Sequence, residues 1–263
     1  MDKKLLMQEV AKIEEQHGVQ VLYIAETGSR TWGFPSENSD HDISFIYYQI
    51  PWKKDIQDGA TTIRHKYQNI DLRGFDIRQT ITYATKSKLN VYEMMGSHIV
   101  YAQNETVALT VKTIVSHYYT RAVLYDAVVG QAARAFKIIN AKNVQHVTRY
   151  CLMGSFLKRN ESKVPLTMET LKPDAPISNE LIDMVSRLRQ LSDREFEDFY
   201  RSQEYQELYG FIKHVCDAHV YIPREYLQID KWLEFANVQY KNLIFKLAHY
   251  PMELTYNDAS FKG

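Results

Sequence analysis

The feature that most constrains the fold is the stretch from Thr27 to Tyr48, which reads TGSRTWGFPSENSDHDISFIYY. It follows a short apolar run at residues 19–25, VQVLYIA, whose length and β-branched content are typical of a buried strand. A Gly-Ser pair ends that run, and an Asp-x-Asp pair opens a second strand at residues 40–48. The order strand, Gly-Ser turn, short helix, acidic strand therefore fixes the start of the fold.

The second strand carries two acids on one side. Residues two apart in a strand face the same way, so Asp40 and Asp42 point together, whereas Ile43, Phe45 and Tyr47 point towards the core. Two carboxylates about 5 Å apart repel each other by roughly 3 kcal/mol at an effective dielectric constant near 20. A fold that brings them together needs a cation or a proton, and hard divalent cations such as Mg²⁺ prefer oxygen ligands.

The Gly-Ser turn supplies a second kind of binding group. Backbone N–H groups and the hydroxyl of Ser29, at a turn after Gly28, can bind phosphate oxygens. Arg30 could also reach a phosphate, although a solvated arginine is an equally good interpretation. Either motif alone is common, but in this order they predict a site that brings a polyphosphate to metal ions held by carboxylates.

A third acid is expected later in the chain, with two candidates. Residues 61–72 are predicted to form one strand that carries Asp71 between apolar neighbours, and Gly74 is expected to break it. Asp76 stands where an N-cap would open a helix over residues 77–88. The spacing puts Asp71 and Asp76 on opposite faces of a regular strand unless Gly74 makes a bulge.

Strand signals nearly vanish after residue 104. Residues 49–60 are expected to be a polar loop or short helix, and residues 161–178, with three prolines, a long loop. The segments with apolar residues at helical spacing are 2–17, 105–118, 121–140, 143–159, 179–191, 193–219 and 231–248. We therefore expect an α/β (α+β) fold, with a small mixed sheet flanked by helices in residues 1–103 and an all-α domain in residues 104–263.

Composition excludes some classes of protein. Of the 263 residues 45% are apolar and 24% charged, which is typical of a globular chain, and Lys plus Arg (32) equal Asp plus Glu (32), so net charge does not favour nucleic acid. Cys151 and Cys216 have no CxxC spacing and are interpreted as thiols of a reducing compartment. The charged N-terminus has no apolar h-region, so no signal peptide is expected, and no apolar run approaches the ~20 residues of a membrane span. A soluble cytoplasmic protein without membrane partners is expected.

The motifs resemble those of a known superfamily. Gly-Ser, Asp-x-Asp and a later acid between apolar residues resemble the nucleotidyltransferases typified by DNA polymerase beta. More narrowly, GSRTWGFPSENSDHDISFIY, IDLRGFDIRQ and EMMGSHIVY resemble predicted nucleotidyltransferases linked to RNA-repair pathways. The resemblance is strong over roughly the first hundred residues and weaker around residues 144–150.

The resemblance implies roles for particular residues. The phosphate-binding pair and the two motif metal ligands fall on Gly28, Ser29, Asp40 and Asp42. For the third carboxylate, Asp71 fits the strand rule and is favoured as metal ligand and general base. Asp76 lies in the segment that the narrower family displays and remains the alternative, with helix capping as its expected role.

A basic helix face is the remaining candidate site. Lys142, His146 and Arg149 are spaced to share one face of a helix. Lys142 and Arg149, with Arg30, are the candidates for contacting the nucleotide. Four further basic residues could line the same cleft towards a triphosphate or an RNA acceptor: Arg134, Lys137, Lys158 and Arg159. For each one, a solvated helix face is the alternative, and Trp32 is expected to pack the short helix rather than stack a base.

The resemblance implies a metal-dependent nucleotidyltransferase. With Mg²⁺ (or Mn²⁺) as cofactor, it would move a nucleoside monophosphate from a triphosphate such as ATP to an acceptor hydroxyl and release pyrophosphate. An RNA end is the favoured acceptor, and a small molecule or a protein side chain are alternatives. A non-catalytic, antitoxin-like nucleotide-binding module is the alternative from outside enzymology. The base preference and the oligomeric state stay open.

Overall fold

The computed structural model of the protein describes residues 1–37, 39–49, 62–219, 229–249 and 253–261. The chain forms two units, which are described separately. The first unit, here the sheet unit, comprises Met1–Thr31, Ser39–Tyr119 and Leu227–Gly263. The second, here the helical unit, comprises Trp32–Asn38 and Thr120–Tyr226. Apart from Gln49, the expected polar loop at residues 49–60 lies outside the described residues.

The sheet unit is built on a mixed sheet in the order β3-β4-β2-β1-β5-β6. Its strands are β1 (Val19–Thr27), β2 (His41–Gln49), β3 (Thr62–Tyr67), β4 (Ile70–Asp76), β5 (Val100–Gln103) and β6 (Thr255–Tyr256). The β2–β4 pair is parallel, and the other neighbours are antiparallel. A mixed sheet with flanking helices confirms the expected α/β class.

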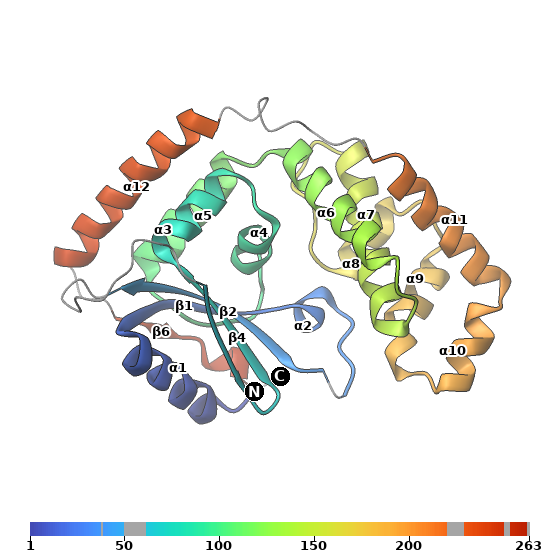
Figure 1. Ribbon diagram of the computed structural model, residues 1–263, viewed down its shortest axis with the longest axis horizontal. Helices are drawn as coiled ribbons and strands as arrows, with labels where there is room; N and C mark the ends of the chain where they lie inside the picture. Colours follow the sequence, from blue (N-terminus) through green and yellow to red (C-terminus); the bar gives the residue numbers. More distant parts are fainter. Residues whose placement is uncertain (38, 50–61, 220–228, 250–252, 262–263) are drawn as a thin grey trace. The chain divides into compact units, whose positions relative to one another are not determined.

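Helices cover both faces of this sheet (Figure 1). On one face lies α1 (Lys3–His17), which inserts Leu6, Val10 and Ile13 into a core with strand residues. Gly18 ends α1 in the left-handed conformation, as its position predicts. The opposite face packs against α3 (Ile77–Thr85), α4 (Leu89–Met95) and α5 (Glu105–His117), and α12 (Ile229–His249) packs on α3 and α5.

The expected single strand at residues 61–72 is wrong. The segment is a hairpin in which β3 and β4 are joined at Gln68, whose φ of 51° is the left-handed conformation of a tight turn. Gly74 does not break the strand but lies inside β4, where a Cβ would come 2.3 Å from the ring of Phe45. The Phe45 ring on the neighbouring strand, rather than a turn, therefore requires this glycine.

The helical unit differs from expectation mainly in where helices end. Its main helices are α6 (Arg121–Ala135), α7 (Ala141–Arg159), α9 (Asn179–Ser186), α10 (Asp193–Tyr200) and α11 (Gln203–Asp217). The helix expected over residues 193–219 is two, because Ser202 caps a new helix start. The expected loop at residues 161–178 contains a short helix, α8 (Met168–Leu171), and a 3-10 turn at Lys172–Asp174.

The division into units differs from the expected boundary between residues 103 and 104. Helix α5 belongs to the sheet unit because Val107 and Val111 lie in its core, and α12 belongs there because Leu243 and Leu247 do. Conversely, residues 32–38 group with the helices. Helical periodicity identifies the helices but not the face on which each one packs.

The structure also bears on the expectations about membrane spans and cysteines. In the part of the chain that the structure describes, no helix has the length and apolar character needed to cross a membrane. Cys151 and Cys216 are both free thiols, the first of them buried. The pKa of Cys151 is raised by the hydrogen bond with Cys216 and by burial, which keeps that thiol protonated.

Candidate active site

One row of polar side chains runs across the sheet. Strand register pairs Thr27 with Asp42, Asp42 with Asp71, and Asp71 with Lys66. Paired residues on neighbouring strands lie side by side on the same face, about 4.8 Å apart. The structure therefore brings Asp42 and Asp71 together, with a lysine at one end of the row and a threonine at the other.

The Gly-Ser turn lies directly against this row. Gly28 has a φ of +75°, and a Cβ built on it would be 2.3 Å from Oδ2 of Asp42. Both the backbone conformation and the close carboxylate therefore require glycine. Ser29 begins the short helix α2 (Ser29–Trp32), and its buried hydroxyl makes a long contact of 3.5 Å with the hydroxyl of Ser39.

Asp40 is placed differently from Asp42. It lies one residue before β2, and its Oδ2 is 3.3 Å from Nζ of Lys66. Both side chains are about half exposed, so this ion pair contributes little to stability. The acid of Asp40 is thus turned to the lysine end of the row.

The structure distinguishes the two candidates for the third carboxylate. The β2–β4 register runs unshifted from His41–Ile70 to Tyr47–Asp76, so Gly74 makes no bulge and Asp71 and Asp76 stand on opposite faces. Asp76 is 2% exposed and caps α3, accepting hydrogen bonds from the Arg78 backbone N–H (2.8 Å) and Nε (3.0 Å). The predicted cap is confirmed, and the geometry favours Asp71 as the third acid of the site, which stays a prediction.

The donor set suits a hard cation only in part. Among the described residues, no three His, Cys, Asp or Glu side chains are grouped closely enough to hold a metal ion. Asp42 and Asp71 offer adjacent carboxylate oxygens, which water would have to complete into a magnesium shell. The predicted ligand Asp40 instead contacts Lys66, so the three-carboxylate set stays a prediction.

Arg30 ties the two motifs together. Its guanidinium donates a 2.8 Å hydrogen bond to the carbonyl of Ser39, the residue before Asp40. The turn and the acidic segment are therefore joined by a side chain that the sequence suggested as a phosphate contact. That contact stays a prediction.

A buried group on the opposite face of the sheet escaped the sequence analysis. Glu26 is 0% exposed, and its Oε2 lies 2.9 Å from Nδ1 of His41 and accepts a hydrogen bond from the hydroxyl of Tyr101. His41 therefore faces away from the aspartates on either side of it. The available signal was Glu26 itself, an acid at a core-facing position of an apolar strand.

In the helical unit, the predicted basic face of α7 is largely buried. Arg149 is 0% exposed, stacks 4.1 Å from the ring centre of Trp32 and donates Nε to the carbonyl of Leu166 at 2.9 Å. Trp32 is 8% exposed, so its expected packing role is confirmed. Burial and the neighbouring cations lower the pKa of His146 to about 4. Lys142 stays exposed. A nucleotide contact by Lys142 or Arg149 stays a prediction.

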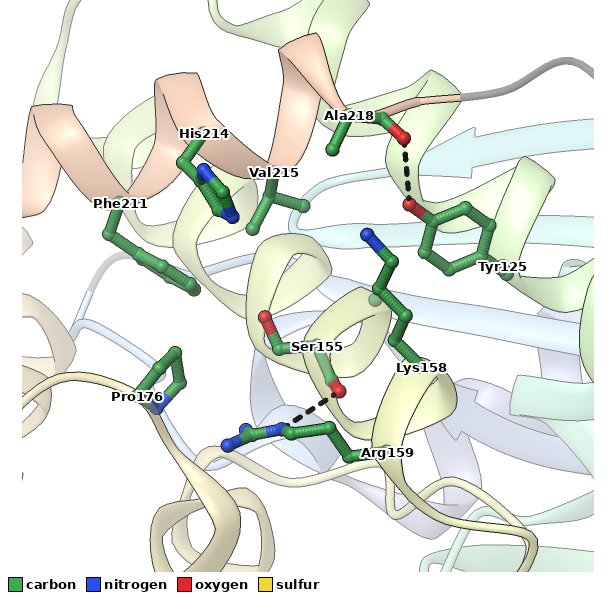
Figure 2. Close-up of a pocket in the computed structure, with 10 residues that line it drawn as sticks. Tyr125, Ser155, Lys158, Arg159, Pro176, Phe211, His214, Val215 and Ala218 are labelled. Carbon is green, nitrogen blue, oxygen red and sulfur yellow. Dashed lines mark hydrogen bonds between the residues drawn. The ribbon is translucent and has the colours of Figure 1, made fainter.

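A cavity of about 210 Å³ in the helical unit is lined by residues of α6, α7 and α11. Figure 2 shows the Lys158 side chain reaching up between Val215 and Tyr125. Arg159 also lines the cavity, and its Nε donates to the carbonyl of Ser155 at 3.2 Å. Two of the predicted basic residues thus border an apolar hollow, while a role in binding RNA or triphosphate stays a prediction.

Similarity to known proteins covers different lengths of the chain. This chain is 35% identical over 108 residues to the uncharacterized protein YcgL of Bacillus subtilis (strain 168). That match spans 40% of this chain and 42% of the relative. A crystal structure of a nucleotidyltransferase-like protein from Exiguobacterium sibiricum 255-15 is 10% identical, with a TM-score of 0.32 over 92% of this chain and 79% of that one. A TM-score at this level supports no conclusion.

The family model matches far more of the chain than the curated relative does. The model described as RlaP, RNA repair pathway DNA polymerase beta family, matches residues 2–233. The match includes the Gly-Ser turn, both strands with Asp42 and Asp71, and all of the helical unit. It agrees with the resemblance drawn from the motifs. This chain therefore belongs to the RNA repair pathway DNA polymerase beta family.

Proposed function

We propose that the protein is a magnesium-dependent nucleotidyltransferase that transfers a nucleoside monophosphate to an acceptor hydroxyl. The acceptor oxygen would form a bond to the α-phosphorus of the triphosphate. The bond from that phosphorus to the bridging oxygen would break, and pyrophosphate would leave. The acceptor proton would pass to a carboxylate.

The register of Asp42 with Asp71 beside Gly28 is the observation that carries this proposal. Two acids on adjacent strands have an unfavourable charge interaction that a divalent cation would relieve. The glycine turn against Asp42 leaves backbone N–H groups next to them without an intervening side chain. Phosphate oxygens and a cation would therefore meet at one end of the sheet.

Each residue of the candidate site then has a role. Asp42 and Asp71, with Asp40 once it leaves Lys66, would hold Mg²⁺ or Mn²⁺. A bound divalent ion supplies neutralisation of charge on the leaving pyrophosphate and a lower pKa for the attacking hydroxyl. Asp71 would accept the acceptor proton, while the Gly28–Ser29 turn would hold the phosphates. Arg30 would keep the segment before Asp40 against that turn.

An RNA end is the acceptor that the family description favours. In the helical unit, Lys158 and Arg159 at the cavity of Figure 2 are cations that could contact a phosphate backbone. Binding to RNA would then weaken steeply as salt is raised, because each neutralised phosphate releases a counterion.

One observation favours the alternative of a non-catalytic nucleotide-binding module. Lys66 already supplies a positive charge to Asp40, and its register position puts it next to Asp71. A lysine in this place could relieve part of the carboxylate repulsion without a metal ion. The module would bind a triphosphate without releasing pyrophosphate.

Asp42→Asn separates these two functions. With Mg²⁺, labelled triphosphates and RNA, the wild type should release pyrophosphate and label the RNA, and Asp42→Asn should reduce the rate by at least about 100-fold. The substitution keeps the shape of the side chain and removes its charge. The exposed Asp198, changed to Asn in the helical unit, is the matched control and should leave the rate unchanged.

Two results would contradict the enzyme. Triphosphate binding without pyrophosphate release from any acceptor would support the module instead. Equal rates for wild type and Asp42→Asn would place the chemistry elsewhere in the chain. Omitting RNA while supplying small hydroxyl compounds tests the acceptor separately from the reaction.

A further inference from the structure

The segment Ser39–Asp42, here the acidic segment, contacts a buried carboxylate through the side chain of His41. His41 stands between Asp40 and Asp42 in sequence but points to the opposite face of the sheet, where its Nδ1 lies 2.9 Å from Oε2 of Glu26 on β1. The hydroxyl of Tyr101 on β5 donates to the same oxygen. Three strands thus converge on one acid, directly behind the strand end that carries the aspartates.

Burying Glu26 and His41 costs desolvation free energy, so stability alone does not explain the pair. Glu26 is 0% exposed and His41 is 8% exposed, and Glu26 Oε1 has no hydrogen-bond partner among the described residues. A buried ion pair or charged hydrogen bond is often no more stabilising than well-packed apolar side chains. The pKa of Tyr101 is raised by burial and by Glu26, so its phenol stays protonated and remains a donor.

The backbone near Asp40 needs such support. Ladder pairing of β2 begins at His41, so Ser39 and Asp40 lie outside it. Ser39 is held through its carbonyl by Arg30, and His41 is held through its side chain by Glu26. Both flanks of Asp40 are therefore fixed by side chains of the β1–α2 segment.

We propose that Glu26, through His41 and supported by Tyr101, is a positioning residue that orders the segment Ser39–Asp42 and so presents the two aspartates to a divalent cation. The proposal rests on the proposed function for the cation alone. The ordering of the segment is a property of the chain that can be measured without metal. Partners of this kind, which orient a ligand without touching the metal, commonly control metal affinity.

The sheet unit contains a matched pair that serves as a control. Glu9 on α1 is 1% exposed, and its Oε2 lies 2.6 Å from Nε2 of His65 on β3. This pair is on the same face of the sheet as Glu26 and His41. His65 precedes Lys66, the partner of Asp40, but Glu9 itself contacts His65 and Lys12. Glu9→Gln therefore changes a buried Glu–His contact without touching the acidic segment.

Full-length Glu26→Gln, Tyr101→Phe and Glu9→Gln would be compared with wild type by hydrogen–deuterium exchange and by Mn²⁺ binding followed by electron paramagnetic resonance. We expect faster exchange at residues 39–42 and about tenfold weaker Mn²⁺ binding for Glu26→Gln. Tyr101→Phe should move both values in the same direction by less. Glu9→Gln should change neither, and Asp42→Asn should abolish Mn²⁺ binding.

The outcomes separate this inference from the proposed function. Unchanged exchange at residues 39–42 in both Glu26→Gln and Tyr101→Phe would overturn the inference. So would faster exchange with unaltered Mn²⁺ affinity, or an equal effect of Glu9→Gln. If the wild type itself binds no Mn²⁺, the proposed metal-dependent function fails, and exchange alone then decides whether Glu26 orders the segment. If Glu26→Gln does not fold, Tyr101→Phe provides the test.

Discussion

Gly28 is the residue whose constraint is easiest to isolate. Gly28→Ala should lose stability through its left-handed φ, by about 1 kcal/mol, and should also displace the Asp42 carboxylate. Mn²⁺ binding and pyrophosphate release should both fall, the first measured by paramagnetic resonance and the second by a coupled assay.

Gly33 gives the matched control for that change. Its φ is +90°, but a Cβ there would meet nothing within 4 Å. Gly33→Ala should therefore show a similar backbone strain without loss of Mn²⁺ binding. Equal loss of binding in both variants would mean that backbone strain, rather than contact with Asp42, is what matters at Gly28.

At the residue scale, the sequence predicted the residues of the candidate site but not the residues that support them. Asp42, Asp71 and Gly28 could be proposed because local spacing sets their faces and their turn. Glu26 could not, because its partner Tyr101 is 75 positions away and only sheet pairing brings the two together. Asp40 was expected beside Asp42, but the structure turns it to Lys66, a contact that needs the β3–β4 hairpin.

Helix α7 carries a prediction about pH. The pKa of His146 is lowered to about 4 by burial and by Lys142, Arg149 and Arg189, so the folded protein keeps this imidazole neutral. The unfolded chain binds a proton below about pH 6.5, so stability should fall as pH drops from about 6.5 to 4, by up to about 3 kcal/mol. Urea unfolding across this range would measure the fall.

His146→Gln should remove that part of the pH dependence. The substituted side chain cannot titrate, so the difference in unfolding free energy between wild type and variant should shrink as pH falls towards 4. A constant difference from pH 7 to pH 4 would show that His146 titrates normally in the folded protein. Loss of the ring contact with Trp32 adds an offset that does not depend on pH.

At the element scale, periodicity predicted most helices and strands, and it failed where a single residue changed the direction of the chain. Residues 61–72 contain no Asn-Gly or Asp-Gly pair that would predict a turn. The turn instead uses Gln68, which adopts the left-handed conformation despite its side chain. The helix expected at 193–219 is interrupted because Ser202 caps a second start, a choice that local propensity leaves open. Short-range patterns set the type of an element better than its ends.

The division of the whole molecule gives a prediction at a site distant in sequence from the aspartates. Leu243 on α12 is 1% exposed and lies in the core cluster that α12 shares with α3 and α5. Leu243→Ala should destabilise the sheet unit by about 2–5 kcal/mol. Hydrogen exchange should therefore speed up in α3 and α5.

Val238 on the same helix is the control. It is 49% exposed, and Val238→Ala should change stability by less than about 0.5 kcal/mol. Exchange in α7 should stay near its wild-type rate in both variants if the units open separately. An equal increase in α3 and α7 would show that the chain unfolds as one cooperative body. The expected boundary at residue 103 missed this division because periodicity does not reveal which helix a distant sheet will bury.

The core of the sheet unit draws on residues near both ends of the described chain, from Leu22 to Leu247. During synthesis, a ribosome delivers the strands first, then the intervening helices, and α12 only near the end. Helices α3 and α5 must therefore keep the apolar side that α12 covers exposed while residues 120–219 emerge and can already fold. We expect a stalled chain that lacks α12 to engage chaperones through that face, although its later helices are complete.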